Sequence, residues 1–412
     1  MKRFLILITI FGLIGTVTNL VYISPIPSLF AAVCFPVILL YRNSFPTLVF
    51  WLFLFFIYVM VSTTLYYPAS FSNFKFYRYD GNFLISYLPL LVLPFLSLNI
   101  NIDKLFRYFL YFTTVISSVV FIGKGFQLSG FTGLFLATNA AGGFYSILTS
   151  LAFIYFLERK TYCNLLFLTL NLFFLYTTYS RGSVLGLVLG ALLYYFFHIR
   201  KTYFIYLIFL AICAVQIYIL FQTYPLYVKY ISGGPTKDFY QNYTDFISKN
   251  YGVVSTKFNN VLIRIYQTWP RAIDCFFHSP VVGTGFGSID DVPFKFKTKI
   301  PFLLATNSQE QKVFSDSHAH HSFLNFLGEL GLVGLLIFFK FWKTVYAFLT
   351  KNNYDSRIRS FLLISFYNLT IMSFTEHRIT TPSNALPFVL ALSLYYVFVN
   401  YKKKLAHDTF YS

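Results

Sequence analysis

Long apolar stretches separated by short polar segments make up most of the chain. About twelve of these stretches approach the roughly 20 residues that an α-helix needs to cross a bilayer, whereas barrel strands would be shorter and of alternating polarity. The pattern therefore predicts an all-α, polytopic membrane protein with about twelve transmembrane helices. The predicted spans centre on residues 4–22, 26–41, 48–66, 83–98, 105–123, 138–157, 162–178, 182–198, 202–222, 322–340, 358–375 and 384–400.

One polar segment, residues 223–321, is much longer than the others and lies between the ninth and tenth predicted spans. It holds ten Lys and Arg, seven Asp and Glu, and four of the seven histidines. Loops of this length in a compact protein are usually functional or disordered. Its varied composition favours a loop domain of short helices. The chain then divides into residues 1–222 with nine spans, the loop domain 223–321, and residues 322–412 with three spans and a basic tail.

The composition changes this picture by excluding a soluble protein. Hydrophobic residues make up 57% of the chain, aromatic residues 22% and charged residues only 11%, whereas soluble domains carry about 25% charged residues. A globule of 412 residues could not bury so much apolar surface. A soluble enzyme is therefore excluded.

The formal net charge of +18 follows the predicted topology. If the N-terminus is cytoplasmic, seventeen Lys and Arg fall in cytoplasmic segments and five in the short outer loops. Cytoplasmic loops of membrane proteins carry such an excess. We therefore expect both termini in the cytoplasm and the large loop outside. The positive charge indicates orientation and contact with membrane lipid, and we expect no nucleic-acid partner.

A polar motif, Thr177 to Ser183, lies at the outer end of the eighth span and contains Ser180 and Arg181. An arginine at this depth is costly unless it faces water or an anion, although it could also extend to the interface. Glycines follow at intervals of four residues, which favours close helix packing. Packing explains the glycines and leaves a ligand-binding role open for Arg181.

The stretch from Phe258 to Phe277 mixes apolar and polar positions and predicts an interfacial helix, bent or broken near Pro270. Arg264 and Arg271 are seven residues apart, so they would share one face of a continuous helix. Paired guanidinium groups suit a diphosphate. Contact with lipid headgroups is the alternative interpretation.

The glycine-rich segment PVVGTGFG, residues 280–287, predicts a tight turn. A dinucleotide-binding loop would need a preceding strand, a following helix and a later acidic residue, and the pattern indicates none of these. Further along, Glu329 falls inside an apolar run and is a candidate for a buried charge.

Three histidines, His318, His320 and His321, stand within four residues at the entrance to the tenth span. One interpretation is a metal site, but only Asp316 lies close by and cysteine ligands are absent. A second is a general base, since imidazole titrates near neutral pH and can accept a proton from a sugar hydroxyl. A third is a loop cluster without a chemical role.

Together these motifs resemble the bacterial O-antigen ligase and O-antigen polymerase superfamily over roughly residues 135–340. The resemblance rests on their order, on the membrane sidedness and on one large periplasmic loop before the tenth span. The local similarities are Ser180-Arg181-Gly182, Arg264 with Trp269 leading to PVVGTGFG, and the histidine cluster running to Gly331-Leu332-Val333-Gly334.

The resemblance implies that a periplasmic histidine and two or three arginines are the functional residues. His320 takes the position of the histidine, eleven residues before Gly331, and Arg181 and Arg264 take those of the arginines. Where the family usually has Asn, this chain has His321, so either histidine could be the base. The spacing from arginine to tryptophan is one residue longer than expected, which keeps Arg271 as an alternative. We expect supporting roles for His318, Ser180 and Glu329.

The function that this resemblance implies is a glycosyltransferase of the bacterial inner membrane. It would transfer a glycan from a polyprenyl (undecaprenyl) diphosphate carrier to an acceptor sugar, without a cofactor and without a metal. A ligase that uses lipid A-core as the acceptor is the first expectation, because of the position of the single large loop. The alternative is a polymerase that joins repeat units, with a chain-length regulator protein as a further partner.

Two other classes of function remain open. A transporter or flippase for lipid-linked oligosaccharides would need charged or unwound sites near the middle of the membrane. Ionisable residues are few within the spans, and His and Arg cluster outside, which favours an enzyme. A non-catalytic assembly scaffold is the third class.

Overall fold

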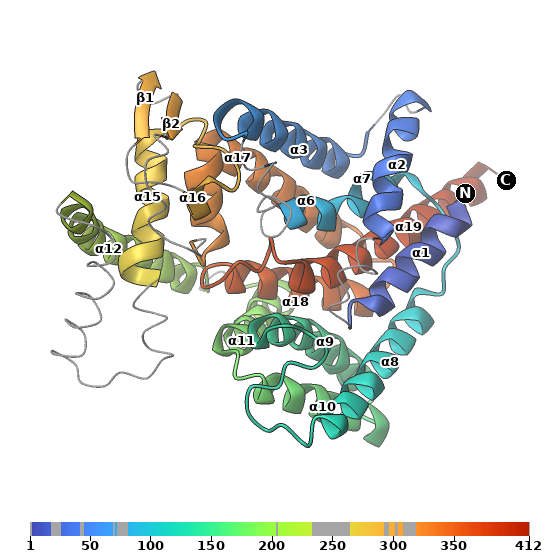
Figure 1. Ribbon diagram of the computed structural model, residues 1–412. Helices are drawn as coiled ribbons and strands as arrows, with labels where there is room; N and C mark the ends of the chain where they lie inside the picture. Colours follow the sequence, from blue (N-terminus) through green and yellow to red (C-terminus); the bar gives the residue numbers. More distant parts are fainter. Residues whose placement is uncertain are drawn as a thin grey trace.

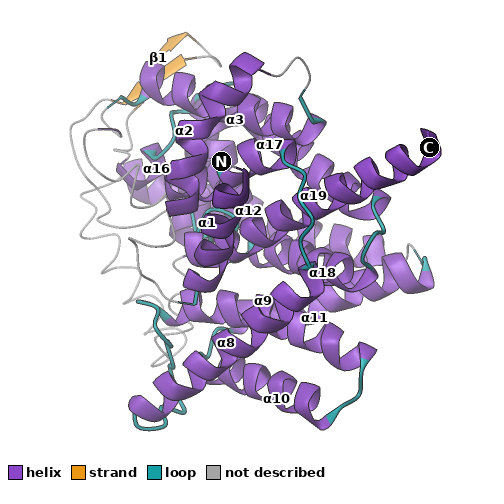
Figure 2. Ribbon diagram, turned by 90° about the vertical axis from the view of Figure 1, so that its right-hand side faces the viewer, coloured by secondary structure: helices purple, strands orange, loops and turns teal. Residues whose placement is uncertain are grey.

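The described residues form a bundle of helices with one small hairpin of strands (Figures 1 and 2). A computed structural model describes residues 2–17, 26–41, 45–68, 71, 81–202, 205–232, 264–291, 296–300, 304–307 and 319–411. In the first half of the chain the helices are α1 (Lys2–Gly15), α2 (Ile26–Tyr41), α3 (Thr47–Tyr66), α6 (Gly81–Tyr87), α7 (Pro89–Val92), the 3-10 turn η1 (Leu93–Phe95), α8 (Ile102–Gly123), α9 (Thr138–Glu158), α10 (Tyr162–Thr177) and α11 (Arg181–Tyr194).

The second half begins with the π-helical η2 (Tyr195–Arg200) and α12 (Ile205–Ser232). The described parts of the large loop are the π-helical η3 (Arg264–Thr268), α15 (Trp269–His278), α16 (Ser288–Asp291), β1 (Phe296–Ile300) and β2 (Leu304–Asn307). The last helices are α17 (Ser322–Lys351), α18 (Ser356–Met372) and α19 (Pro382–Tyr411).

Each of the twelve predicted spans overlaps helical structure among the described residues. Among the described residues, six helices are long and apolar enough to cross a membrane: α3, α8, α9, α11 together with η2, α17 and α19. Four shorter apolar helical stretches accompany them. The helical membrane class is confirmed, whereas the number of crossings stays a prediction. The antiparallel pair β1–β2 is the departure from an all-helical fold, and it lies within the loop where we expected only short helices.

Local sequence determines where several helices begin, because the first backbone amides of a helix need acceptors from outside it. The Asn101 side chain accepts from the Lys104 amide at 3.0 Å. Thr161 accepts from the Asn164 amide at 3.3 Å. Asp355 accepts from the amides of Arg357 and Ile358. These caps separate α8, α10 and α18 from the segments that precede them.

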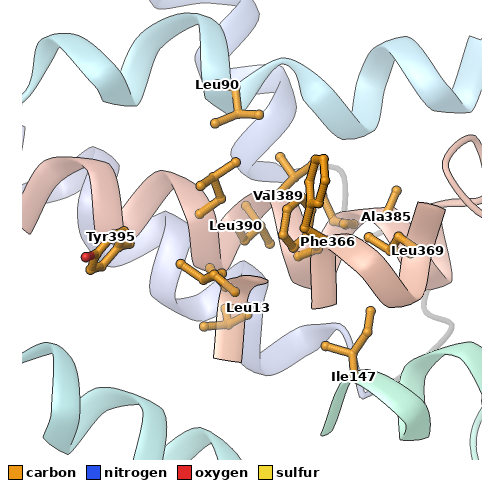
Figure 3. Close-up of a cluster of buried hydrophobic side chains, with 14 of the residues drawn as sticks. Leu13, Leu90, Ile147, Phe366, Leu369, Ala385, Val389, Leu390 and Tyr395 are labelled. Carbon is orange, nitrogen blue, oxygen red and sulfur yellow. The ribbon is translucent and has the colours of Figure 1, made fainter. Parts of the chain in front are cut away.

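Helices α8 to α11 form one group, which joins the rest of the bundle mainly through α18 and α19 (Figures 1 and 2). The apolar core at this junction draws on helices far apart in the sequence (Figure 3). In α19, 83% of the most apolar stretch is buried, and in α9 78%, against 17% in α11. Helices α9 and α19 are therefore central, and α11 lies at the periphery. The core residues labelled in Figure 3 are Leu13, Leu90, Ile147, Phe366, Leu369, Ala385, Val389, Leu390 and Tyr395.

Helix α17 is interrupted at Gly331, whose backbone adopts φ 63° and ψ −168°. The glycine-rich turn of residues 280–287 fits against this break. Pro280 and Val281 carbonyls accept from the amides of Leu332 and Val333 at 2.9 and 3.1 Å. In an unbroken helix these amides would bond to residues four positions earlier. The turn thus replaces the missing helical bonds.

The carbonyl groups that lose their helical partners at the break also accept hydrogen bonds from outside α17. The Glu329 carbonyl accepts from the Gly285 amide at 2.9 Å, and the Tyr58 hydroxyl donates to the Leu330 carbonyl at 2.9 Å. A Cβ at Gly283 would lie 2.1 Å from the Glu329 carbonyl oxygen. The structure therefore agrees with the prediction of a tight turn, and it requires glycine because the two backbones touch.

The glycine spacing after Arg181 lies where α11 packs on α18. A Cβ at Gly190 would lie 2.9 Å from the Asn368 amide nitrogen, and one at Gly186 would lie 2.4 Å from the Asn368 side-chain oxygen. Close approach of the two helices, predicted from this spacing, is therefore present between α11 and α18.

We expect Gly190→Ala to lower the free energy of unfolding by about 1–3 kcal/mol, because the added methyl group meets backbone atoms that cannot move aside easily. Gly123→Ala is the matched control, since a Cβ there meets no atom within 4 Å. Melting temperatures of the purified proteins in detergent would measure both effects. Equal melting temperatures for the two variants would contradict the packing of α11 on α18.

Candidate functional site

The loop of residues 373–381, between α18 and α19, gathers the polar groups of the candidate site. It lies at the end of the bundle where α9, α11, α17 and α19 begin. The Ser373 carbonyl accepts from the Ser322 amide at 2.9 Å, which joins the loop to the start of α17. A Cβ at Gly182 in α11 would lie 3.1 Å from the Thr375 hydroxyl. The 373–381 loop is thus enclosed by helices from three parts of the sequence.

Glu376 in this loop binds two of the residues singled out in the sequence. Its carboxylate accepts from the Arg264 guanidinium through Oε1 and lies 3.1 Å from His320 Nδ1 through Oε2. Arg264 also donates to the Thr375 carbonyl at 2.8 Å. The Asn139 side-chain NH₂ group donates to Oε1 at 3.2 Å. Arg264 and His320 therefore meet on a single carboxylate.

The electrostatics of Glu376 follow from these neighbours. Burial alone would raise the pKa of the Glu376 carboxyl group. The hydrogen bond with His320 and the positive charges of Arg378 and Arg264 outweigh burial and lower this pKa to about 2. Glu376 is therefore an ionised carboxylate at any physiological pH.

Arg378, two residues further on, is buried with 3% exposure. Its guanidinium donates to the Asn139 carbonyl, to Asn384 Oδ1 at 3.2 Å and to Ser180 Oγ at 3.3 Å. Burial lowers the pKa of Arg378, and the charge of Glu376 opposes that effect. Arg378 thereby ties the first turns of α9, α11 and α19 to the 373–381 loop.

Arg181 is the first residue of α11 and is exposed. Its neighbour Ser180 is buried. The Ser180 hydroxyl accepts a hydrogen bond from the Arg378 guanidinium and forms a second one, of 2.8 Å, with the Ser183 hydroxyl. The preceding residue, Tyr179, has a left-handed backbone with φ 55°, which is uncommon for a residue with a side chain. The turn that presents Arg181 is thus anchored beside the 373–381 loop, and Arg181 itself is exposed.

The two candidate bases have different surroundings. His320 keeps 31% of its side chain exposed, whereas His321 has 4% exposure. His321 Nδ1 accepts from the Leu324 amide at 3.2 Å and caps α17. Its ring packs edge-on against Trp269 at 5.6 Å. Burial lowers the pKa of His321 to about 3, so this imidazole is neutral and enclosed.

Arg264 and Arg271 do not lie on one regular helix. Arg264 belongs to η3, a π-helical turn with wider spacing, and Arg271 belongs to α15. The wider turn rotates Arg264 away from the face that a seven-residue spacing would give in an α-helix. Arg271 is 1% exposed, whereas 19% of the Arg264 side chain is exposed. The helix type changes immediately before Pro270, close to the predicted break.

Glu329 is fully buried and accepts from the Ile289 amide at 3.3 Å and from the Asn325 side chain at 2.8 Å. Asn325 in turn accepts from the Ala319 amide at 3.3 Å. Glu329 is thus linked indirectly to the backbone beside His320. The remaining predicted support residue, His318, lies outside the described residues.

The sequence patterns did not single out Glu376 or Arg378 as site residues. The signal was present as Glu376-His377-Arg378, three ionisable residues in a row between two predicted spans. Ionisable residues next to membrane helices are costly unless they are paired. What could not be read from the sequence was which distant residues pair with them.

No group of three or more His, Cys, Asp or Glu side chains that could hold a metal ion occurs within the described part of the chain. Asp316 and His318, on which the metal interpretation of the histidine cluster depends, lie outside that part.

We expect His321→Asn to reduce the loss of stability in acid. Asn can cap a helix as His does, but it does not titrate. In the wild type, His321 stays neutral in the folded state and binds a proton in the unfolded state below its ordinary pKa of 6.5. The unfolded state then binds more protons, so stability falls as pH decreases from about 6.5 towards 3, by up to about 1.4 kcal/mol per pH unit.

Melting temperatures between pH 7.5 and 4.5 would show this effect as a shallower decline for His321→Asn. The control is His407→Asn in α19, because His407 is exposed. A decline as steep as that of the wild type in both variants would contradict the buried, neutral state of His321.

Comparison with known proteins identifies the region that holds these residues. A family model described as O-antigen ligase matches residues 165–339. No curated protein in the comparison matches the chain. The matched region includes Arg181, Arg264 and His320 and ends within α17, before Glu376 and Arg378. The resemblance drawn from the sequence motifs is confirmed over residues 165–339, where the chain is similar to the O-antigen ligase family.

Proposed function

We propose that the protein is a membrane glycosyltransferase that transfers a glycan from a polyprenyl diphosphate carrier to an acceptor hydroxyl on the periplasmic face. The family match supports membrane glycan processing of the O-antigen ligase and polymerase kind. The observation that carries the finer proposal is the contact of both Arg264 and His320 with Glu376. It gathers a cation and a candidate base in one place.

The charge balance around the 373–381 loop suits an anionic substrate. Among the described residues at this end of the bundle, Arg181, Arg264 and Arg378 stand against the carboxylate of Glu376. Four helices, α9, α11, α17 and α19, also begin at this end, and each N-terminus carries roughly half a positive charge. A diphosphate would supply the missing negative charge, and the fork-like guanidinium groups match its oxygens.

In the proposed reaction His320 accepts the proton of the acceptor hydroxyl. The acceptor oxygen then forms a bond to the anomeric carbon, and the bond from that carbon to the diphosphate oxygen breaks. The electron pair leaves with the polyprenyl diphosphate, whose growing charge Arg181 and Arg264 stabilise. The proton on His320 passes afterwards to the departing diphosphate or to water.

The surroundings favour His320 over the other candidate bases. His321 is enclosed, and its Nδ1 is engaged by the Leu324 amide. Glu376 is held ionised by its neighbours, and a carboxylate whose pKa is about 2 is too weak a base for a sugar hydroxyl. His320 alone among the three combines partial exposure with a basic side chain.

We expect His320→Ala to lower the rate of glycan transfer by about 10²–10⁴-fold, the usual contribution of a general base. Arg264→Ala and Arg181→Ala should each cost about 10²–10³-fold, as the loss of a group that stabilises developing charge does. The assay would use purified protein in lipid vesicles, a polyprenyl-diphosphate-linked glycan and an acceptor. A chelator of divalent cations would be present, because the proposal needs no metal.

Matched controls for these variants are His407→Ala and Arg159→Ala, both at exposed positions away from the 373–381 loop. Full activity of a well-folded His320→Ala protein would exclude His320 as the base. Movement of the intact donor across the vesicle membrane without transfer would instead indicate the alternative of a transporter or flippase.

Within this class we prefer a ligase that transfers the glycan to lipid A-core, and the alternative is a polymerase that joins repeat units. Deletion of the gene in the bacterial host separates them. Loss of a ligase leaves long chains on the lipid carrier, whereas loss of a polymerase leaves single repeats on the core. A normal surface glycan in the deletion strain would contradict both.

A further inference from the structure

Glu376 connects two segments that the sequence separates widely. One carboxylate oxygen accepts from Arg264 and from the Asn139 side chain, and the other lies 3.1 Å from His320 Nδ1. Only 13% of the Glu376 side chain is exposed, so water competes weakly for these contacts. A carboxylate that uses both oxygens in this way fixes its partners in direction as well as in distance.

The contact with Glu376 determines which nitrogen of His320 carries the proton. An ionised carboxylate can only accept hydrogen bonds, so Nδ1 of a neutral His320 must be the donor. The other ring nitrogen, Nε2, then has no proton and presents a lone pair. This is the tautomer that a general base needs, and a carboxylate partner on the far nitrogen is a common means of holding it.

The backbone around His320 is held by groups other than Glu376. The residue has a left-handed backbone with φ 47°, a conformation that persists only when its surroundings impose it. Ala319 donates from its amide to Asn325 Oδ1 at 3.3 Å and accepts at its carbonyl from the Thr268 hydroxyl at 3.2 Å. Loss of the Glu376 charge should therefore release the ring of His320 and leave its main chain in place.

We propose that Glu376 is a positioning residue for the transfer reaction, which holds the His320 ring with Nδ1 as the donor to its carboxylate and Nε2 as the nitrogen that accepts the proton of the acceptor hydroxyl. This inference rests on the proposed function, because it assigns Glu376 a task only if His320 is the base. When His320 takes up the proton, the carboxylate also stabilises the imidazolium ion. Glu376 itself neither contacts the reacting atoms nor exchanges a proton.

A double-mutant cycle tests this assignment, with kcat and the KM for the lipid-linked donor as readouts. Glu376→Gln should lower kcat by about tenfold to a hundredfold, less than His320→Ala, because part of the general-base contribution of about 10²–10⁴ remains. Its effect on the donor KM should be small. In a His320→Ala background the same substitution should have no further effect, since Glu376 would act through the imidazole.

Two further variants complete the comparison. Glu376→Asp keeps the charge and should recover part of the kcat that Glu376→Gln loses. Glu158→Gln is the matched control, because Glu158 is also paired with an arginine, Arg357, but lies at the opposite end of α9. It should leave kcat unchanged.

Each contrary outcome has a distinct meaning. A Glu376→Gln effect that persists in the His320→Ala background, or that raises the donor KM without lowering kcat, would show that Glu376 serves only to anchor Arg264, and the inference would fail. Wild-type kcat in Glu376→Gln together with an inactive His320→Ala would overturn this inference alone. An active His320→Ala would overturn the proposed function instead.

A measurement on the wild-type protein keeps the test independent of how the Glu376 variants fold. Nitrogen NMR of histidine-labelled protein, with the His320 signal assigned by its loss in His320→Gln, reports which ring nitrogen carries the proton. The inference requires the form protonated at Nδ1 near neutral pH. The form protonated at Nε2 would contradict it.

Discussion

The interruption of α17 at Gly331 fixes the segment that carries Arg264 relative to the one that carries His320. At this break the helix gives up its own hydrogen bonds and accepts those of the 280–287 turn. The turn follows directly after α15, and His320 directly precedes α17. In a bilayer an unsatisfied backbone group costs several kcal/mol, so the turn and the break cannot separate cheaply. The 280–287 turn and the break in α17 look independent in the sequence, but they bond to each other through their backbones. This contact holds the end of α15 against α17.

The 373–381 loop then completes the arrangement with charge. Glu376 is nearly enclosed and yet ionised, because Arg264, Arg378 and His320 offset the cost of its burial. Arg378 is buried as well, and its guanidinium donates hydrogen bonds to residues at the starts of α9, α11 and α19. Removing one partner of such a group leaves a buried charge without compensation, which is strongly unfavourable. The loop is therefore well suited to hold a histidine and an arginine at fixed positions beside an anionic substrate.

Several features could be predicted from single segments because their causes are local. The apolar stretches overlap the helices, because each stretch is continuous in the sequence and near the length of a membrane-spanning helix. The glycines of residues 280–287 predicted a tight turn, and the spacing of Gly186 and Gly190 predicted close packing. The role of His321 could not be predicted from its own segment in this way. Its role as a helix cap depends on where α17 begins, and the family's usual Asn at this position is itself a good cap, which makes the exchange physically understandable.

What the sequence determined by itself was the membrane class and the approximate positions of the helices. It also predicted a set of candidate site residues, among them Arg181, Arg264 and His320. Hydrophobic length, charge placement and residue type are all readable along one segment at a time. Only the tertiary structure decided that Glu376 joins Arg264 to His320, that Arg378 is buried beside Ser180, and that His321 and Arg271 are enclosed. Pairing and burial depend on which distant segments meet. That follows from the packing of the whole bundle around α9, α18 and α19, to which every segment contributes and which none encodes alone.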